Sequence, residues 1–64
     1  MSQFAQFDAV RLKFGLPEYA IPAGSGAAVL EVYPGGYEIE VTDAHGETLY
    51  LGRAADDELE PLTR

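Results

Sequence analysis

The sequence predicts a small all-β domain, because alternating apolar and polar residues are folded back on themselves by two glycine-containing turns. The first hairpin covers residues 27–41 and the second covers residues 37–51. Alternation with a period of two residues is typical of strands that have one buried face. A chain of 64 residues has room for one hydrophobic core. We therefore expect a single domain over residues 1–64, with residues 1–6 flexible.

The chain opens with an expected strand over residues 8–13, in which Val10 and Leu12 share one face. Residues 15–26 contain two prolines and three glycines, which indicates a long first loop. Loops of this length in small domains fold over their own side chains or carry function. Three apolar residues of this loop are expected to point inward: Leu16, Tyr19 and Ile21.

The first hairpin turn is predicted at residues 33–36, where Pro34 and Gly35 occupy the central positions of a type II turn. This turn fixes the register of the two strands that it joins. Three apolar pairs then share the inner face: Val32 with Tyr37, Leu30 with Ile39 and Ala28 with Val41. Two pairs share the outer face: Glu31 with Glu38 and Val29 with Glu40. A slip of one residue would bury the glutamates, so the pattern favours this register.

The second turn, at residues 43–46, is predicted as a three-residue hairpin loop in which Gly46 has a positive φ. It pairs Asp43 with Glu47, Val41 with Leu49 and Ile39 with Leu51, and it places Tyr50 outside, opposite Glu40. Both turns put the same residues of the central strand inside. The expected core of the two hairpins is therefore Leu30, Val32, Ile39, Val41, Leu49 and Leu51.

The last segment is expected to form one helical turn over residues 54–58 and a short final strand over residues 59–62. Pro61 confines that strand to an edge of the sheet. Five short strands with a long first loop and a helical turn before the last strand predict a small five-stranded SH3-like barrel. The alternative is an open meander sheet that dimerises to cover its apolar face.

Charge is the main functional signal: 11 acidic against 4 basic residues give a net charge of −7. Few cations are available to neutralise phosphates, so we expect no nucleic-acid partner and no membrane partner. The electric field of a protein with this net negative charge attracts a basic protein. The outer face concentrates the acid, and its candidate partner-binding residues are Glu31, Tyr33, Glu38, Glu40 and Tyr50. The alternative is that the acid only maintains solubility and prevents edge-to-edge aggregation.

No catalytic, cofactor-binding or metal site is expected. The chain has no cysteine, which excludes disulfides and thiol chemistry and favours a reducing cytoplasm. His45 is the only histidine, and a turn residue of a hairpin lacks the pocket and the second positioned group that catalysis needs. No signal peptide or membrane-spanning run is evident. These observations predict a cytoplasmic protein that is not an enzyme.

Seven stretches resemble a family of small, uncharacterised bacterial proteins: Phe7-Asp-Ala-Val-Arg-Leu-Lys13, Leu16-Pro-Glu18, Ile21-Pro-Ala-Gly24, Val29-Leu-Glu-Val-Tyr33, Tyr37-Glu-Ile-Glu-Val41, Asp43-Ala-His-Gly-Glu-Thr48 and Leu59-Glu-Pro-Leu62. The chain departs from the family pattern at residues 26–28 and is more polar than expected at residues 50–55. The resemblance implies an SH3-like barrel, and some members resemble antitoxins or immunity proteins. The first strand and loop are also similar in outline to SH3-like domains of nitrile hydratase β-type subunits.

Together these observations predict a non-enzymatic acidic protein-binding module, of the antitoxin or immunity type, that occludes a basic partner protein. One alternative is an accessory or structural subunit that stabilises a larger enzyme through a hydrophobic rim. A second is a nucleic-acid-associated SH3-like domain, which the charge disfavours. The sequence leaves open whether the chain forms a homo-oligomer.

Overall fold

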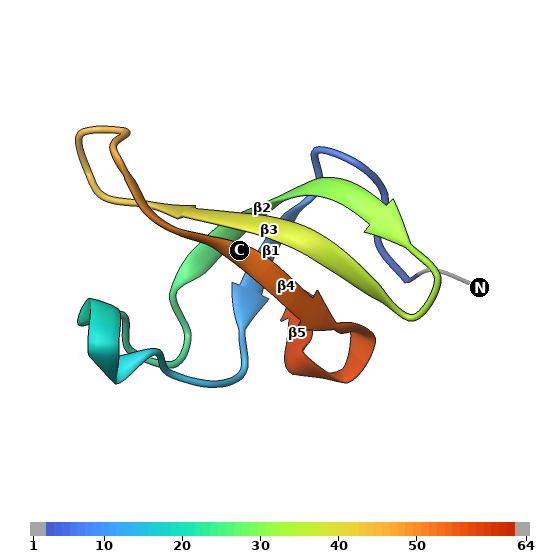
Figure 1. Ribbon diagram of the computed structural model, residues 1–64, viewed down its shortest axis with the longest axis horizontal. Coiled ribbons are helices and arrows are strands. Elements are labelled where there is room, and N and C mark those ends of the chain that lie inside the picture. Colours follow the sequence, from blue (N-terminus) through green and yellow to red (C-terminus); the bar gives the residue numbers. More distant parts are fainter. Residues whose placement is uncertain (1–2, 63–64) are drawn as a thin grey trace.

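The fold is a single antiparallel sheet of five strands, seen in a computed structural model that describes residues 3–62 (Figure 1). Along the sheet the strands follow the order β4-β3-β2-β1-β5. Their bounds are Ala9–Leu12 (β1), Gly26–Tyr33 (β2), Gly36–Thr42 (β3), Thr48–Ala55 (β4) and Leu59–Pro61 (β5). Two short 3-10 turns, η1 (Pro17–Tyr19) and η2 (Asp56–Glu58), lie before β2 and before β5. The all-β prediction with five strands is confirmed. The helical turn expected over residues 54–58 is the shorter 3-10 turn Asp56–Glu58, and Ala54 and Ala55 belong to β4.

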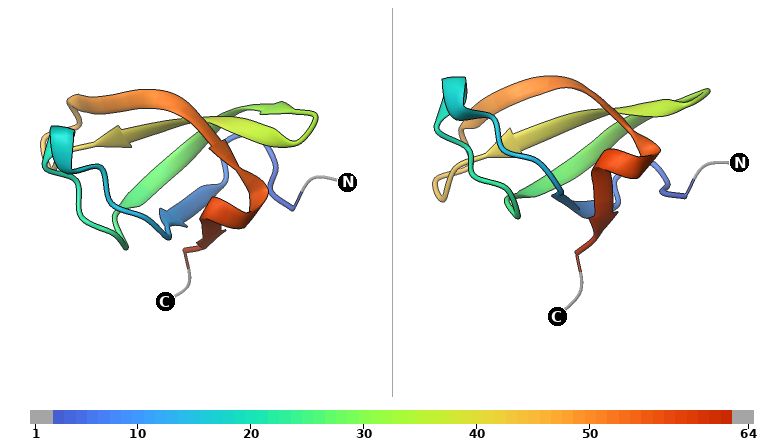
Figure 2. Two further views of the ribbon diagram at one scale, coloured as in Figure 1. Left: turned by 60° about the horizontal axis from the view of Figure 1, so that its bottom comes forward. Right: turned by 90° about the horizontal axis from the view of Figure 1, so that it is seen from below.

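The sheet is curled but not closed. Figure 2 shows β1 and β5 folded beneath β3 and β4, so that one face of the sheet encloses the core. The terminal strands of the order, β4 and β5, do not pair with each other within residues 3–62, so the closed barrel is not confirmed. Buried apolar residues gather on the inner face: Phe4, Val10, Leu12, Ile21, Val29, Tyr37, Ile39, Val41, Ala54 and Leu59. Each large side chain of this kind stabilises the fold by roughly 1.5–3 kcal/mol through burial.

The first hairpin turn forms as predicted, but the strands beyond it do not keep the predicted register. Gly35 has a φ of 82°, and Val32 pairs with Tyr37 and Glu31 with Glu38. A β-bulge between Val29 and Glu31 then adds one residue to β2, so that Val29, not Leu30, pairs with Ile39. A bulge reverses the faces of all residues beyond it.

This bulge corrects several predicted positions. Val29 is fully buried, whereas Leu30 is only half-buried, and Ala28 pairs with Glu40 instead of Val41. Val32, expected in the core, keeps its predicted partner Tyr37 but is 36% exposed. The physical reason for the bulge is the bend of β2, whose residues 26–28 pair with β1 and whose residues 28–33 pair with β3. Bulges increase the local twist and bend of a strand, which this double pairing requires.

The second hairpin repeats this behaviour. Gly46 has a φ of 85°, and the Asp43 backbone N–H donates to the Glu47 carbonyl at 2.9 Å, as a three-residue loop requires. The register then shifts again: Thr42 pairs with Thr48, but Val41 pairs with Tyr50, which leaves Leu49 as the extra residue. The predicted burial of Leu49 and Leu51 is therefore wrong. Leu49 is 41% exposed and Leu51 is 57% exposed.

The long first loop and the N-terminal segment both contribute to the core. Of the expected loop anchors, Ile21 is buried and Leu16 packs against the core, but Tyr19 is 46% exposed. Phe4 is buried edge-on against Tyr37, with ring centroids 5.6 Å apart. Phe4 belongs to the segment expected to be flexible, of which residues 1 and 2 lie outside the described residues. Flexibility at positions 3–6 stays a prediction.

Replacing Gly46 by Val should destabilise the domain by roughly 1 kcal/mol or more, because a β-branched residue is strained at positive φ. A Cβ at this position would meet no atom within 4 Å, so the cost is that of the backbone alone. Urea unfolding measures it, with Gly46→Asn as the control, because Asn adopts positive φ more readily. Equal stability of the Val variant and the parent would contradict the assigned loop geometry.

Candidate functional site

Four of the five candidate partner-binding residues lie on the outer face of the sheet. Glu31 and Tyr33 come from β2, and Glu38 and Glu40 come from β3, where they alternate with the buried Tyr37, Ile39 and Val41. This alternation follows from the two-residue period of a strand. We call the surface made by Glu31, Tyr33, Glu38, Glu40, Leu51 and Arg53 the outer acidic face.

Tyr50 does not belong to this face, which corrects the prediction. The bulge at Leu49 turns its side chain inward, where it is half-buried and packs against the core. Its ring meets Tyr19 edge-on, with centroids 5.0 Å apart. Tyr50 therefore holds the first loop against the sheet. Leu51 takes the position beside Glu40 that was predicted for Tyr50.

The predicted pairing of two glutamates is confirmed. Glu31 lies directly opposite Glu38 across β2 and β3, and Glu31 is exposed. Like charges in this position destabilise a sheet by up to about 1 kcal/mol. The Tyr33 hydroxyl moderates the cost at Glu38, because it donates to the Glu38 Oε1 at 3.5 Å. Arg53 of β4 is the cross-strand neighbour of Glu38 on its other side. Glu31 lies on the solvent side of this arrangement.

Glu40 continues the acid along β3. It lies between Ala28 of β2 and Leu51 of β4, and its carboxylate accepts a hydrogen bond from the Thr48 hydroxyl. The Glu40 carboxylate thus lies between an exposed leucine and a small residue, Ala28. This composition offers both charge and apolar contact to a partner.

The acid at the hairpin tip has a structural role instead. The Asp43 Oδ1 accepts hydrogen bonds from the backbone N–H groups of His45 at 2.8 Å and Glu47 at 2.9 Å. An aspartate side chain that accepts a hydrogen bond from the backbone N–H two residues further along the chain stabilises the turn itself. His45 is exposed at this tip. Within residues 3–62, no group of three or more His, Cys, Asp or Glu side chains is arranged to hold a metal ion.

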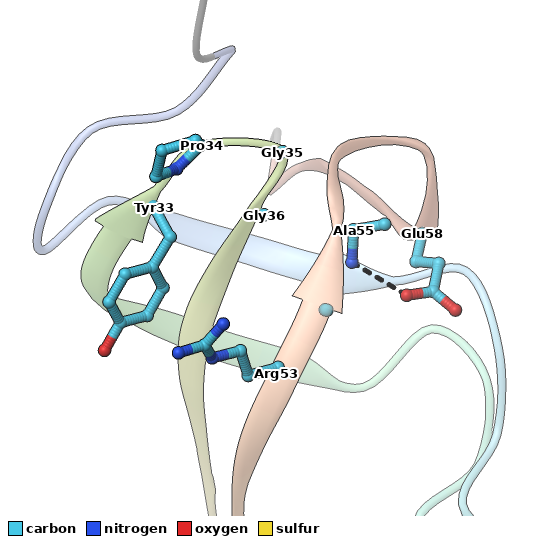
Figure 3. Close-up of a pocket in the computed structure, with 8 residues that line it drawn as sticks. Tyr33, Pro34, Gly35, Gly36, Arg53, Ala55 and Glu58 are labelled. Atoms are coloured by element: carbon cyan, nitrogen blue, oxygen red, sulfur yellow. Dashed lines mark hydrogen bonds between the residues drawn. The ribbon is translucent and has the colours of Figure 1, made fainter.

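A shallow pocket of about 260 Å³ adjoins the outer acidic face at the β2–β3 turn (Figure 3). Its main polar feature is Arg53, whose guanidinium carbon lies 4.0 Å from the centroid of the Tyr33 ring. A contact of this kind contributes about 0.5–1 kcal/mol at an exposed site. Glu58 lines the opposite side, where its Oε1 accepts a hydrogen bond from the Ala55 backbone N–H at 2.8 Å.

Two residues of this face, Leu51 and Arg53, were not identified from the sequence. The alternation in residues 48–53 is compatible with either Tyr50 or its leucine neighbours facing inward, because all three are apolar. The structure shows what Gly52 contributes to the inward position of Tyr50. The Tyr50 ring lies so close to Gly52 that a Cβ at this position would lie 2.4 Å from the Tyr50 hydroxyl oxygen.

Residues 6–61 match the family model described as "Domain of unknown function (DUF4926)", so the chain belongs to the DUF4926 family. The match covers the whole sheet, including both hairpins and the outer acidic face. No match to this chain was found among curated proteins or solved structures. No helix within residues 3–62 has the length and apolar character that crossing a membrane requires.

Proposed function

We propose that this member of the DUF4926 family is a non-enzymatic module that binds a basic protein through its outer acidic face. The observation that supports the proposal most is the cross-strand pair of the exposed Glu31 and the half-buried Glu38, beside which Glu40 adds a third carboxylate to the same face. Folding gains nothing from two glutamates placed opposite each other. A partner that supplies Arg or Lys side chains would turn this repulsion into attraction.

The charge and the apolar residues of this face have separate roles in the proposal. A net charge of −7 steers a cationic partner into encounter and disfavours acidic competitors. Leu51 of this face, which is 57% exposed, supplies apolar area that a lasting contact needs, and Leu49, two residues before it on β4, is 41% exposed. Charged pairs at the rim of an interface set association rate and specificity more than affinity.

We place the module in the antitoxin or immunity class of a bacterial cytoplasm, where it occludes a cationic groove of its partner. The acidic face supports this role, because active-site grooves that bind phosphates or nucleic acid are cationic. We also assign the fold to the SH3-like class. The strand order β4-β3-β2-β1-β5 and the 3-10 turn before β5 support that assignment.

A second candidate function is an accessory subunit that stabilises a larger enzyme. The exposure of Leu49 and Leu51 on one strand favours it, because exposed apolar side chains on neighbouring positions are typical of permanent interfaces. The two functions differ in their dependence on salt. Charge-driven docking weakens as salt rises, whereas an apolar subunit interface does not.

Co-purification of the tagged chain with proteins of its native host tests the first function. The comparison is between the parent and the double variant Glu38→Lys/Glu40→Lys. We expect the parent to retain a net basic protein at physiological salt and the double variant to lose it. If the partner still co-purifies at high salt, and also with the double variant, the subunit function is favoured.

Nucleic acid should bind weakly. We expect a Kd no tighter than about 10⁻⁴ M for DNA or RNA at physiological salt, the weak end of non-specific affinity. The reason is that only four Lys and Arg residues are present in the whole chain. Fluorescence anisotropy with a labelled oligonucleotide measures it. Tight binding that weakens steeply with salt would favour a nucleic-acid-associated domain over both protein-binding functions.

A further inference from the structure

The two edges of the sheet differ in how well they are protected against a further strand. The β5 edge is three residues long and contains Glu60 and Pro61, and both short length and proline block strand addition. The β4 edge is eight residues long and has no proline, lysine or acidic residue. Its bulge at Leu49 disturbs only its beginning. The regular part of β4, residues 50–55, is an open edge.

The hydrogen-bonding groups of this edge can be assigned from the turn. Tyr33 and Gly36 close the first hairpin as a pair, so the backbone groups of Gly36 face β2 and those of Tyr37 face β4. Tyr37 pairs with Ala54, so the groups of Ala54 and Gly52 face β3. Backbone groups alternate along a strand. Those of Leu51 and Arg53 therefore point away from the sheet, at the edge.

Hydrogen bonds within the domain agree with this assignment. The next residue in the same phase is Ala55, and its N–H donates to the Glu58 side chain instead of to β3. Apart from the sheet ladders and the bonds within the 3-10 turns, the backbone hydrogen bonds within residues 3–62 do not involve residues 48–55. Glu58 thus caps one end of the open edge, and the N–H and C=O groups of Leu51 and Arg53 are left for another strand.

Charge indicates which strand would add there. Acid surrounds the edge, with Glu47 before β4, Asp56 to Glu58 after it, and Glu38 and Glu40 on the adjoining strand. Arg53 is the only charged residue of β4, and its guanidinium is directed across the sheet onto the Tyr33 ring, away from the edge (Figure 3). A second copy of this chain would bring another charge of −7. A cationic segment is the complementary occupant.

We propose that a basic, extended segment of the partner protein adds to β4 as a sixth strand, through backbone hydrogen bonds with Leu51 and Arg53. This inference rests on the proposed function and specifies how the partner docks. Main-chain bonds give such complexes their affinity, and alternate side chains give specificity. Lys or Arg side chains on the outer face of the added strand pass over the exposed Leu51 towards Glu40.

Three eight-residue peptides are the probes: alternating Lys–Val, alternating Glu–Val, and Lys–Val with N-methyl groups along one edge. Amide hydrogen exchange by NMR reads out the site residue by residue. We expect Lys–Val to bind and to slow exchange at Leu51 and Arg53, while Gly52 and Ala54 are slow throughout. The other two peptides should bind at least about tenfold more weakly, the effect of about 1.4 kcal/mol.

Leu51→Pro is the protein variant that corresponds to the N-methylated peptide. It removes a backbone N–H that makes no hydrogen bond within the sheet but that the added strand would use. Proline is tolerated on an edge strand when its missing N–H faces solvent. We expect a folded variant whose Lys–Val affinity falls about tenfold or more. Arg53→Pro is the second variant, which removes the other free N–H should the first fail to fold.

The outcomes separate this inference from the proposed function. Binding that Glu38→Lys/Glu40→Lys abolishes, but that neither proline variant nor N-methylation weakens, overturns strand addition and leaves docking on the outer acidic face. No binding of Lys–Val at about 1 mM overturns strand addition by a basic segment, while co-purification still tests the function. Protection of Leu51 and Arg53 in a self-associated chain without peptide would assign the edge to a second copy.

Discussion

Replacing Val29 by Asp should unfold the domain, whereas replacing the neighbouring Leu30 by Asp should leave it folded. Val29 is fully buried and pairs with Ile39, which is equally buried. A carboxylate there would have to be buried without a partner or displace the core, at a cost of several kcal/mol. The free energy of unfolding of a domain is only about 5–15 kcal/mol, so this cost would remove most or all of it.

Leu30 differs because it is the extra residue of the bulge and is only half-buried. Its replacement by Asp should cost roughly 1 kcal/mol, the usual size for a position outside the core. Circular dichroism and urea unfolding measure both variants, and Leu51→Asp provides an exposed control on the neighbouring hairpin. The regular register makes the opposite prediction, with Leu30 buried. If the Leu30 variant unfolds and the Val29 variant stays folded, β2 has the regular register and the assigned bulge is wrong.

The turns and the central strand could be predicted from the sequence because their chemistry is local. Pro34 with Gly35, and Asp43 with Gly46, specify their turns through φ preferences and short-range hydrogen bonds. The alternation of Tyr37, Ile39 and Val41 with glutamates specifies the faces of β3, since burying the glutamates would be costly. Each of these signals lies within four or five residues of the structure that it determines.

The two bulges could not be predicted in the same way, because no local penalty marks them. Val29 and Leu30 are both apolar, and so are Leu49, Tyr50 and Leu51, so either register buries an apolar side chain. At the first bulge a tertiary requirement decides between the two registers, because β2 must bend to pair with both β1 and β3. Phe4 reaches the core through a contact with Tyr37 that is 33 residues away in sequence.

The candidate site residues were predicted correctly only where the predicted strand register holds. Glu31, Tyr33, Glu38 and Glu40 lie on the outer face as predicted, because they lie on β3 itself or between the first turn and the first bulge. Tyr50 lies beyond the second bulge and therefore faces inward. The same shift brings Leu51 and Arg53 to the outer acidic face. The open edge of β4 was not visible in the sequence, since it depends on which strands end the order.

The double variant Glu38→Lys/Glu40→Lys should lose its basic partner while remaining folded. In the complex, the reversed charges would face Arg and Lys side chains, and such like-charge contacts cost several kcal/mol. In the free domain the effects oppose one another. The change relieves the repulsion between positions 38 and 31, but it introduces repulsion with Arg53 and removes the hydrogen bonds from Tyr33 and Thr48. We expect the stability to change by about 1 kcal/mol or less.

A control variant with the same net charge separates docking from simple steering. Asp8→Lys/Glu18→Lys replaces two exposed acids that lie before β1 and on η1, away from the outer acidic face and from the β4 edge. Each replacement adds two charges, so both double variants move from −7 to −3. Co-purification and urea unfolding of the two variants form the test. If docking uses the outer acidic face, only Glu38→Lys/Glu40→Lys loses the partner. Equal losses in both variants would mean that net charge alone attracts the partner and that the face contributes no specific contact.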